Sequence, residues 1–417
     1  NQLTEVEQKK GLTLEHPQVK NRISQTNLLK LLKQKPAPLA SKKNLALLEA
    51  GNFVDDMQRL AEVDWIIEVV VENLEIKKQV FEQVDQYRKL GSIVSSNTSG
   101  ISVEAMIEGR SDDFKKHFLG THFFNPPRYL KLLEVIPTSH TDLEVLSFMK
   151  DFGEDVLGKG VVEAKDTPNF IANRIGTYGL LITVQEMLKG GYSVGEVDSV
   201  TGPVIGRPSS ATFRTLDVVG LDTFAHVAKN VYDQVEGTEK AVFEIPAFIK
   251  EMLEKGWIGA KAGQGFFLKK GKEILELNPV TLQYQDRKKM KSASLEMSKQ
   301  AKGLGNKLKV LLYSDDRVGT LLWNIFSPVL LYSADLLGTI ADDIVAIDQA
   351  MKWGFGWQQG PFEMWDSIGI EKSIAKMKAE GKQVPSWIEE MLASGATSFY
   401  KEESGVLYFY DKGEYKQ

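Results

Sequence analysis

The stretch DWIIEVVVENLEIKKQVFEQVDQYRKLGSIVSSNTS, residues 64–99, decides the fold. Two short runs rich in Val and Ile flank a segment in which charged and apolar residues alternate at helical spacing. Apolar strands joined by an amphipathic helix are typical of a sheet that is covered on both faces. The stretch therefore predicts a β-α-β unit.

The same alternation continues downstream. HFLGTHFF (117–124), LKLLEVI (130–136) and GVVEA (160–164) have strand-like patterns, and TDLEVLSFMKDFGEDV (141–156) has a helical one. We expect residues 1–165 to form a doubly wound α/β domain of the dinucleotide-binding kind.

Beyond Asp166 the patterns are long and helical, and they repeat. EVDSVTGPVIGRPSSATFRTLDVVGLD (196–222) is echoed by AIDQAMKWGFGWQQGPFEMWDSIGIE (346–371). The repetition predicts two related all-α domains, at 166–274 and 310–417, joined by a basic segment at 275–309. That segment is expected to be a solvated linker helix, or else to dock on another domain or on phosphates.

Composition excludes several classes of function. The chain has 417 residues, no cysteine and a net charge of -5. Thiol chemistry and disulfides are excluded, and a surface-wide attraction to nucleic acid is not expected. NQLTEVEQKKGLTLEHPQ shows no signal peptide, so we expect a cytoplasmic protein. The apolar run 320–340 contains Asn324, Pro328 and Asp335, which favour a buried helix over a membrane span.

GTHFFNPPRYLKLLEVIP, residues 120–137, is the first candidate site. His122 and Glu134 lie at equal distances on either side of Arg128, and Asn125 starts the intervening turn. Antiparallel pairing of the two runs would bring the imidazole to the carboxylate, which suits a general base. A purely structural His–Glu hydrogen bond fits the same spacing.

Three further motifs carry polar residues at expected strand or helix ends. SSNTSG (95–100) includes Ser99, and VVVENLEIKK (69–78) includes Glu72 and Lys77. These residues could bind a ligand at the carboxyl ends of strands, or could be helix caps and a solvated lysine. KDTPNFIANRIG (165–176) would direct Asn173 toward an interdomain cleft, or use it to tie two domains together.

Together these motifs resemble the 3-hydroxyacyl-CoA dehydrogenase family over nearly the whole chain. The resemblance rests on SNTS, HFFNP and LEV at 96–99, 122–126 and 133–135, on KDTPNFIANR at 165–174 and on GAKAGQGFF at 259–267. The duplicated helical domain resembles the long members, which are fused to an enoyl-CoA hydratase. A fused hydratase or a homo-oligomer is therefore an expected partner, although no hydratase sequence is present in this chain.

The resemblance implies a role for each motif. His122 would take the 3-hydroxyl proton of a (S)-3-hydroxyacyl-CoA while hydride passes to NAD, and Glu134 would orient His122. Ser99 and Asn173 would bind the reacting end of the substrate. The positions implied near the cofactor are Glu72, Lys77, Ser99, Asn125 and Lys261. No metal is implied, and the expected pathway is fatty-acid β-oxidation.

In one respect the chain departs from the family. The G-x-G-x-x-G turn that holds the pyrophosphate does not occur in the first part of the sequence. We expect that the first β-α-β unit is missing and that the chain from Asn1 binds NADH weakly. Two other functions fit the sequence: an NAD-dependent dehydrogenase of another 3-hydroxy acid, and a non-catalytic scaffold.

Overall fold

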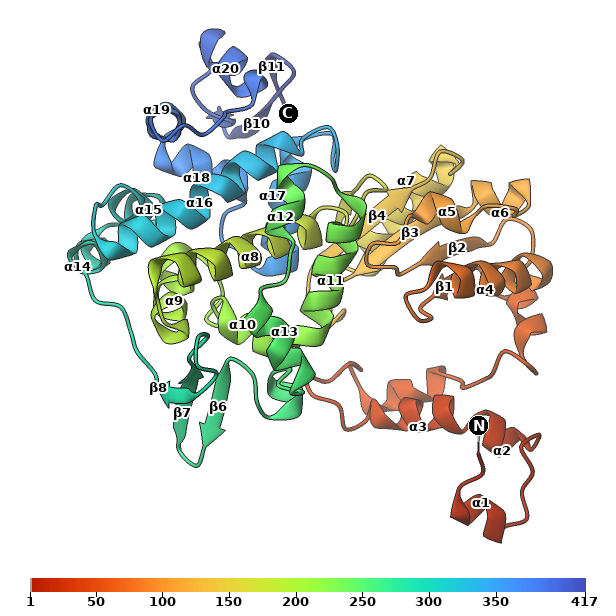
Figure 1. Ribbon diagram of the computed structural model, residues 1–417. Coiled ribbons are helices and arrows are strands. Elements are labelled where there is room, and N and C mark those ends of the chain that lie inside the picture. The colour runs from red at the N-terminus through yellow and green to blue at the C-terminus, as the bar shows by residue number, and fades with distance from the viewer. Residues whose placement is uncertain (1) are drawn as a thin grey trace. The chain divides into compact units, whose positions relative to one another are not determined.

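The computed structural model describes residues 2–417 and divides into two compact units. Unit 1 comprises the residues up to 98, 103–133 and 137–159, and unit 2 comprises 99–102, 134–136 and 160–417. Figure 1 shows the elements of both units, and each unit is described by itself below.

The first part of unit 1 is helical up to residue 62. Thr4 and Glu7 form a capping box at the first helix. The side chain of each residue accepts the backbone N–H of the other. These helices, with η marking short 3-10 or π turns, are α1 (Glu5–Lys9), α2 (Pro17–Lys20), α3 (Arg22–Lys30), η1 (Lys42–Leu47) and η2 (Met57–Glu62).

Strands and helices alternate from Trp65 to Glu163, as the sequence predicts. Strands β1 and β2 pair in parallel with Trp65 opposite Ile93, and β2 pairs in parallel with β3. The five strands form one sheet in the order β1-β2-β3-β4-β5. The strands are β1 (Trp65–Glu68), β2 (Ile93–Ser96), β3 (Phe118–Phe123), β4 (Leu132–Pro137) and β5 (Gly160–Glu163), and the helices are α4 (Leu74–Tyr87), α5 (Val103–Met106), α6 (Asp112–Lys116), α7 (Leu143–Asp151) and η3 (Phe152–Val156). The predicted α/β class is confirmed.

Helix α4 has the two features of a helix that covers a sheet: a residue that caps its N-terminus and an apolar face that is buried. The Asn73 side chain accepts the N–H of Ile76 and so starts the helix. Phe81 and Val84, three residues apart, are buried. The Phe81 ring packs edge-on against Phe118 of β3, with ring centroids 5.0 Å apart. This packing fixes α4 against β3.

Unit 2 is mainly helical, and its longest helices, α8 and α16, pack side by side (Figure 1). Tyr178 and Tyr332, one from each helix, stack with ring centroids 3.8 Å apart. The elements of the first half are α8 (Ala172–Gly190), α9 (Val194–Val200), η4 (Pro203–Ile205), α10 (Phe213–Val219), α11 (Leu221–Gln234), α12 (Thr238–Val242), α13 (Ala247–Glu254), η5 (Ala260–Ala262), β6 (Phe267–Lys270), β7 (Glu273–Leu277) and β8 (Tyr284–Asp286). Those of the second half are α14 (Ala293–Gln300), α15 (Leu304–Leu312), α16 (Arg317–Asp335), α17 (Ile344–Phe355), α18 (Pro361–Ile368), α19 (Ile370–Ala379), α20 (Ser386–Ala393), β9 (Tyr400–Glu403), β10 (Val406–Asp411) and β11 (Glu414–Lys416).

Buried aspartates make equivalent bonds in the two halves. Asp198 accepts the N–H groups of Thr212, Phe213 and Arg214 at the start of α10, and Asp348 accepts those of Phe362 and Glu363 at α18. The second pair of aspartates binds backbone N–H groups at the starts of β6 and β9. Asp217 accepts the N–H groups of Phe266 and Phe267, and Asp366 accepts those of Phe399 and Tyr400. These matched bonds explain why the repeated sequence keeps its aspartates. The exact domain limits stay a prediction.

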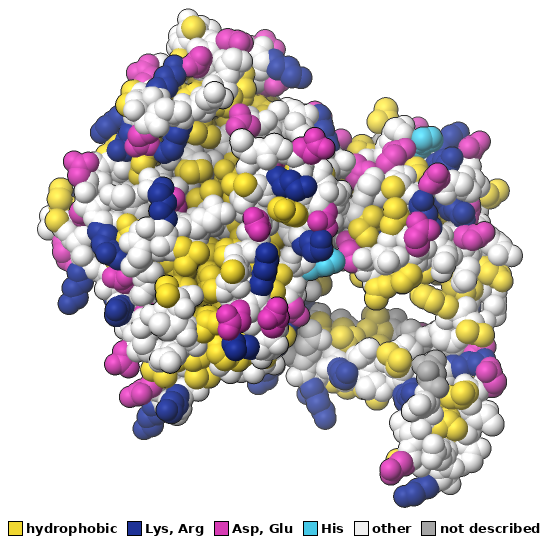
Figure 2. Space-filling view, viewed as in Figure 1, with side chains coloured by type: hydrophobic (Ala, Val, Ile, Leu, Met, Phe, Trp, Pro, Cys, Tyr) yellow, Lys and Arg dark blue, Asp and Glu magenta, His cyan; other side chains and the backbone are white. Residues whose placement is uncertain are grey.

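The segment expected to be a basic linker has more structure than the sequence suggested. Strands β7 and β8 occupy most of 273–286 and pair antiparallel in one sheet with β6, and α14 and α15 follow. The backbone N–H of Lys288 donates to the buried Glu276 carboxylate. The segment predicted as a basic linker at 275–309 thus contains paired strands, whose partners the charge pattern does not show, and its role as a linker stays a prediction. Figure 2 shows basic and acidic side chains interspersed on the visible face.

The apolar run at 320–340 lies largely in α16. Its helix carries Pro328 in its interior, and most of its side chains are buried. Across residues 2–417, the structure has no helix that is both long enough and apolar enough to cross a membrane.

Candidate active site

A buried ionic network occupies the carboxyl ends of β1 and β2 in unit 1. The Glu68 carboxylate accepts two bonds from the Lys77 amine, at 2.9 and 3.0 Å, and one from the Ser96 hydroxyl at 2.5 Å. Lys77 also pairs with Glu72 at 3.2 Å, and the Thr98 hydroxyl donates to Glu72 at 2.6 Å. This edge of a parallel sheet is where ligands bind in open α/β folds.

Lys77 is not the solvated lysine that the sequence allowed. Its side chain is 1% exposed, whereas that of Glu72 is 26% exposed. A buried ammonium group needs paired carboxylates to offset its desolvation, and here it has two. Both residues are among those expected near the cofactor, and of the two Glu72 is the one that reaches solvent.

His122 lies in β3 of unit 1 and is 4% exposed. Its ring packs against Phe124, with ring centroids 4.6 Å apart. The end of the strand is fixed by a bond from the Phe123 N–H to the Asn97 side-chain oxygen, 2.9 Å long. His122 is thus held on a rigid element, as a general base requires.

The connection from β3 to β4 carries Asn125 and is held at two places within unit 1. The Lys159 amine donates to the carbonyls of Pro127 and Leu130. The Arg128 guanidinium donates to the carbonyls of Ala37 and Leu39 at 2.9 and 3.0 Å. Burial lowers the pKa of Lys159. Lys159 has no signal in the sequence, because its partners are backbone carbonyls, which leave no side-chain pattern.

Glu134 belongs to the part of β4 that lies in unit 2 and is fully buried. Its Oε1 accepts the N–H groups of Ile171 and Ala172, at 3.2 and 2.9 Å, at the start of α8. The first N–H groups of a helix have no partner within the helix and favour negative charge. The carboxylate therefore has a fixed orientation and a favourable place for its charge.

The turn around Ser99 is packed tightly within unit 2. A Cβ on Gly100 would lie 2.2 Å from the Asn169 side-chain oxygen and 2.4 Å from the Asn230 amide nitrogen. The Asn230 amide donates to both Asn169 and the Gly100 carbonyl. Only glycine fits here, so the backbone beside Ser99 is closely constrained.

Asn173 occupies the second position of α8, next to the residue whose N–H binds Glu134. Its neighbour Arg174 is buried and donates to Glu239 and to the Tyr332 hydroxyl of α16. Arg174 is thus one of the residues that link the two halves of unit 2, a contact that the sequence alone did not predict. The available signal was a charged residue, Arg174, within the mainly apolar motif NFIANRIG (169–176). An arginine that is buried there needs a polar partner.

Lys261 lies in η5 and forms an ion pair with Asp222, 2.6 Å long, in which both side chains are about half exposed. The structure thus brings Glu72 and Lys77 into contact in unit 1, and in unit 2 it places Asn173 one residue after Ala172, whose N–H donates to Glu134. The pairing of His122 with Glu134 joins residues of different units and stays a prediction. Lys261 as a cofactor residue is also a prediction.

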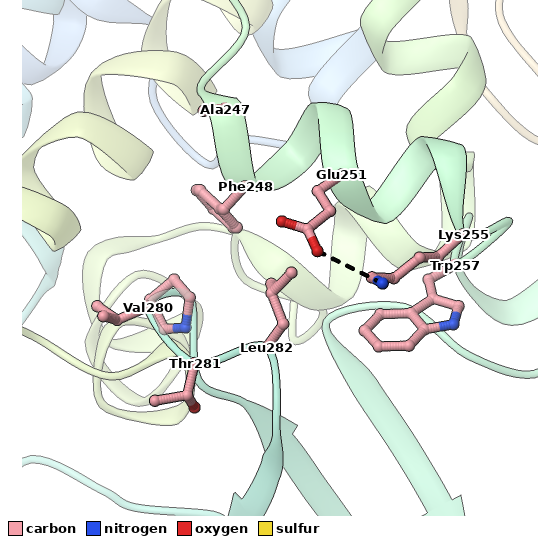
Figure 3. A pocket seen from close by; sticks show the side chains of 9 residues that line it. Ala247, Phe248, Glu251, Lys255, Trp257, Val280, Thr281 and Leu282 are labelled. Atoms are coloured by element: carbon pink, nitrogen blue, oxygen red, sulfur yellow. Dashed lines mark ion pairs between the residues drawn. The ribbon is translucent and has the colours of Figure 1, made fainter.

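A separate cavity of about 500 Å³ lies between α13 and the turn after β7 in unit 2. Figure 3 shows Phe248 and Leu282 facing its interior, with an ion pair between Glu251 and Lys255. None of the predicted site residues lines it. It lends no support to the candidate active site.

Known proteins match most of the sequence. Residues 9–167 match the family described as "3-hydroxyacyl-CoA dehydrogenase, NAD binding domain", and residues 170–269 match "3-hydroxyacyl-CoA dehydrogenase, C-terminal domain". A probable 3-hydroxyacyl-CoA dehydrogenase of Bacillus subtilis is 68% identical over 416 residues, which is 100% of this chain and 53% of the relative. The chain thus spans about half the length of that protein.

A second relative and a solved structure extend the comparison. A probable 3-hydroxyacyl-CoA dehydrogenase of Deinococcus radiodurans is 45% identical over 250 residues, or 60% of this chain and 72% of the relative. The crystal structure of 3-hydroxybutyryl-CoA dehydrogenase from Escherichia coli matches with a TM-score of 0.66 and 19% identity, covering 91% of this chain and 92% of that one, which bears on the fold alone. On the family matches and the Deinococcus relative, the chain belongs to the 3-hydroxyacyl-CoA dehydrogenase family, and its N-terminal part is that family's NAD-binding domain.

Proposed function

We propose that the chain is the dehydrogenase part of an enzyme that oxidises (S)-3-hydroxyacyl-CoA to 3-oxoacyl-CoA with NAD, in fatty-acid β-oxidation. The observation that carries the proposal is the placement of Glu134: a fully buried carboxylate bonded to the first N–H groups of α8, next to Asn173. A family assignment alone would not distinguish a working site from a decayed one. The helix N–H groups hold the Glu134 carboxylate in one orientation, which supports a task of orienting an imidazole.

The proposed mechanism assigns each residue one task. His122 accepts the proton of the substrate's 3-hydroxyl, and Glu134 holds the imidazole and stabilises its positive charge. Ser99 and Asn173 bind the oxygen atoms at the reacting end. Removing the proton as the C3 hydride leaves avoids a protonated ketone, so positioning within about 3 Å of the hydroxyl governs the rate.

NAD, when bound, supplies the hydride acceptor. The residues at the carboxyl ends of β1 and β2 fit a nucleotide, because the Glu72 carboxylate is partly exposed and fixed by Thr98 and Lys77. Such a carboxylate can accept hydrogen bonds from ribose hydroxyls. Asn125 and Ser99 would complete this side, and Lys261 would contribute a positive charge.

The test is oxidation of NADH by the full-length protein in the presence of acetoacetyl-CoA. Turnover with this substrate, and none with a 3-hydroxy or 3-oxo sugar acid that lacks CoA, is the expected result. A folded protein that consumes NADH with neither substrate would contradict the proposal and favour a scaffold.

The proposed partners and location of the protein are a fused hydratase domain, a homo-oligomer and the cytoplasm. The length of the Bacillus relative beyond the matched part leaves room for a fused enoyl-CoA hydratase domain, which supports the proposed partner. A homo-oligomer and a cytoplasmic location stay predictions, to be checked by light scattering and by cell fractionation.

A further inference from the structure

Glu68 is a buried carboxylate that neither the catalytic nor the cofactor assignments use. It lies at the end of β1 and is 4% exposed. Both of its oxygens are engaged: Oε1 accepts from Lys77 and from the N–H of Val70, and Oε2 accepts from Lys77 and the Ser96 hydroxyl. Four hydrogen bonds from three donor groups fix this side chain in one orientation.

The Lys77 amine also has all of its hydrogen-bond donors engaged. An ammonium group has three N–H donors. Two contacts reach Glu68 and one reaches Glu72 at 3.2 Å, with the Val70 carbonyl at 3.5 Å. With 1% of its side chain exposed, Lys77 has neither a spare donor nor a path to a ligand in this structure.

Glu72 is the member of the network that faces outward. It receives Lys77 on Oε2 and the Thr98 hydroxyl on Oε1. The chain of contacts therefore runs from Ser96 through Glu68 and Lys77 to Glu72. Each link is charged or charge-assisted, and such bonds are shorter and stronger than neutral ones.

We propose that Glu68 is a positioning residue for nucleotide binding, which acts by holding Lys77 against Glu72 so that the Glu72 carboxylate keeps the orientation that the cofactor's ribose requires. The inference rests on the proposed function and deepens its cofactor side. Lys77 is then also a positioning residue, rather than a direct ligand of NAD.

The experiment compares Glu68→Gln with a matched control, Glu276→Gln, in the full-length protein. Glu276 is also fully buried and accepts three bonds, from Gly195, Gln285 and Lys288, but it lies in unit 2 on β7. Both variants keep the side-chain shape and lose one buried charge. Each is assayed by NADH titration, by steady-state kinetics and by thermal unfolding.

Glu68→Gln should raise the Kd of NADH and the KM of NAD about tenfold, which corresponds to ~1.4 kcal/mol. The KM of the acyl-CoA and kcat should change less than about threefold, a margin of ~0.6 kcal/mol. Glu276→Gln should lower the melting temperature without this selective effect. Because a lone buried Lys77 could prevent folding, the double variant Glu68→Gln/Lys77→Met removes both charges and should show the same weak NADH binding.

Either of two results would overturn the inference: normal NADH affinity in folded Glu68→Gln, or equal changes in NADH affinity in the Glu68 and Glu276 variants. Failure of the proposed function looks different. In that case the wild-type protein itself would not oxidise NADH with acetoacetyl-CoA, whatever the variants do.

Discussion

At the scale of single residues, the proposed role of His122 as a general base can be tested by substitution. Only 4% of this residue is exposed, and its ring contacts Phe124. His140, by contrast, lies on the surface of the same unit, where it pairs with Glu104. The two histidines form a natural pair of target and control.

His122→Gln should lower kcat at least 10²-fold, because general-base catalysis typically contributes about 10² to 10⁴. NADH affinity should stay nearly unchanged, since the glutamine removes only the proton acceptor. His140→Gln should have wild-type kcat. Steady-state kinetics and NADH titration provide the measurement, and near-normal turnover of the His122 variant would remove it from the mechanism.

Glu134 allows its two tasks to be separated. A Glu134→Gln side chain can still accept the N–H groups of Ile171 and Ala172 through its amide oxygen, but it loses the charge. We expect a melting temperature close to that of the wild type and a kcat pH profile displaced along the pH axis. Glu134→Ala should lose stability as well, because two helix N–H groups would lack an acceptor. An unchanged profile in Glu134→Gln would favour a structural His–Glu bond.

At the scale of elements, helix α8 shows how packing overrides local propensity. Gly176 and Gly179 both lie inside α8, where alanine normally forms a better helix by about 0.5–1 kcal/mol. A Cβ at Gly176 would lie 2.0 Å from the Phe355 ring, whereas at Gly179 the nearest atom is Val329 Cγ2 at 3.4 Å. Close approach of neighbouring helices, not backbone conformation, explains the first glycine.

Gly176→Ala should therefore lower the free energy of unfolding by about 1–3 kcal/mol, the usual cost of overpacking a core. Gly179→Ala should be neutral or slightly stabilising. Urea denaturation of both variants tests the pair. Equal effects would mean that the Phe355 ring moves aside without cost.

The offset of 150 residues that relates Asp198 to Asp348 places the counterpart of Asn173 next to Asn324. The Asn324 side chain donates to Glu186 of α8 at 2.9 Å. Its side chain joins the two long helices, which agrees with a packing role.

At the scale of the whole molecule, the buried aspartates couple stability to pH. Burial raises the pKa of Asp348 to about 8 and that of Asp198 to about 7. An unfolded aspartate titrates near 3.9. The folded state therefore binds more protons in between, so this contribution to stability is complete below about pH 4 and is lost as the pH rises to about 8.

Asp348→Asn should remove that part of the pH dependence, making the free energy of unfolding less steep between pH 4 and 8. Asp316 is the opposite control: although partial burial opposes it, the N–H groups of Gly319 and Ser294 hold its pKa at about 2. Its contribution is present above about pH 4 and is lost as the pH falls toward 2. The test is denaturation of Asp348→Asn and Asp316→Asn at several pH values. The assignment would be contradicted if both variants changed the pH dependence of stability in the same pH range.

The sequence predicted the strands of the sheet because their signal is local. Runs such as WIIE and IVSS have the period and the β-branched residues of buried strands, and they lie in β1 and β2 as expected. The strands within the basic segment have no such local signal. Strand β7 pairs with β6 and strand β8 pairs with β7, and charge counts do not reveal these partners.

The sequence by itself determined the α/β class, the repeat of the helical half and the motifs that mark the family, since periodicity and spacing are properties of neighbouring residues. Only the tertiary structure decided the partners of the buried charges. Glu68 meets Lys77 across a strand and a helix, and Glu134 meets the α8 amides from 37 residues away. A buried charge takes whichever partner the folded chain brings within about 3 Å, and that choice exists only after the fold has closed.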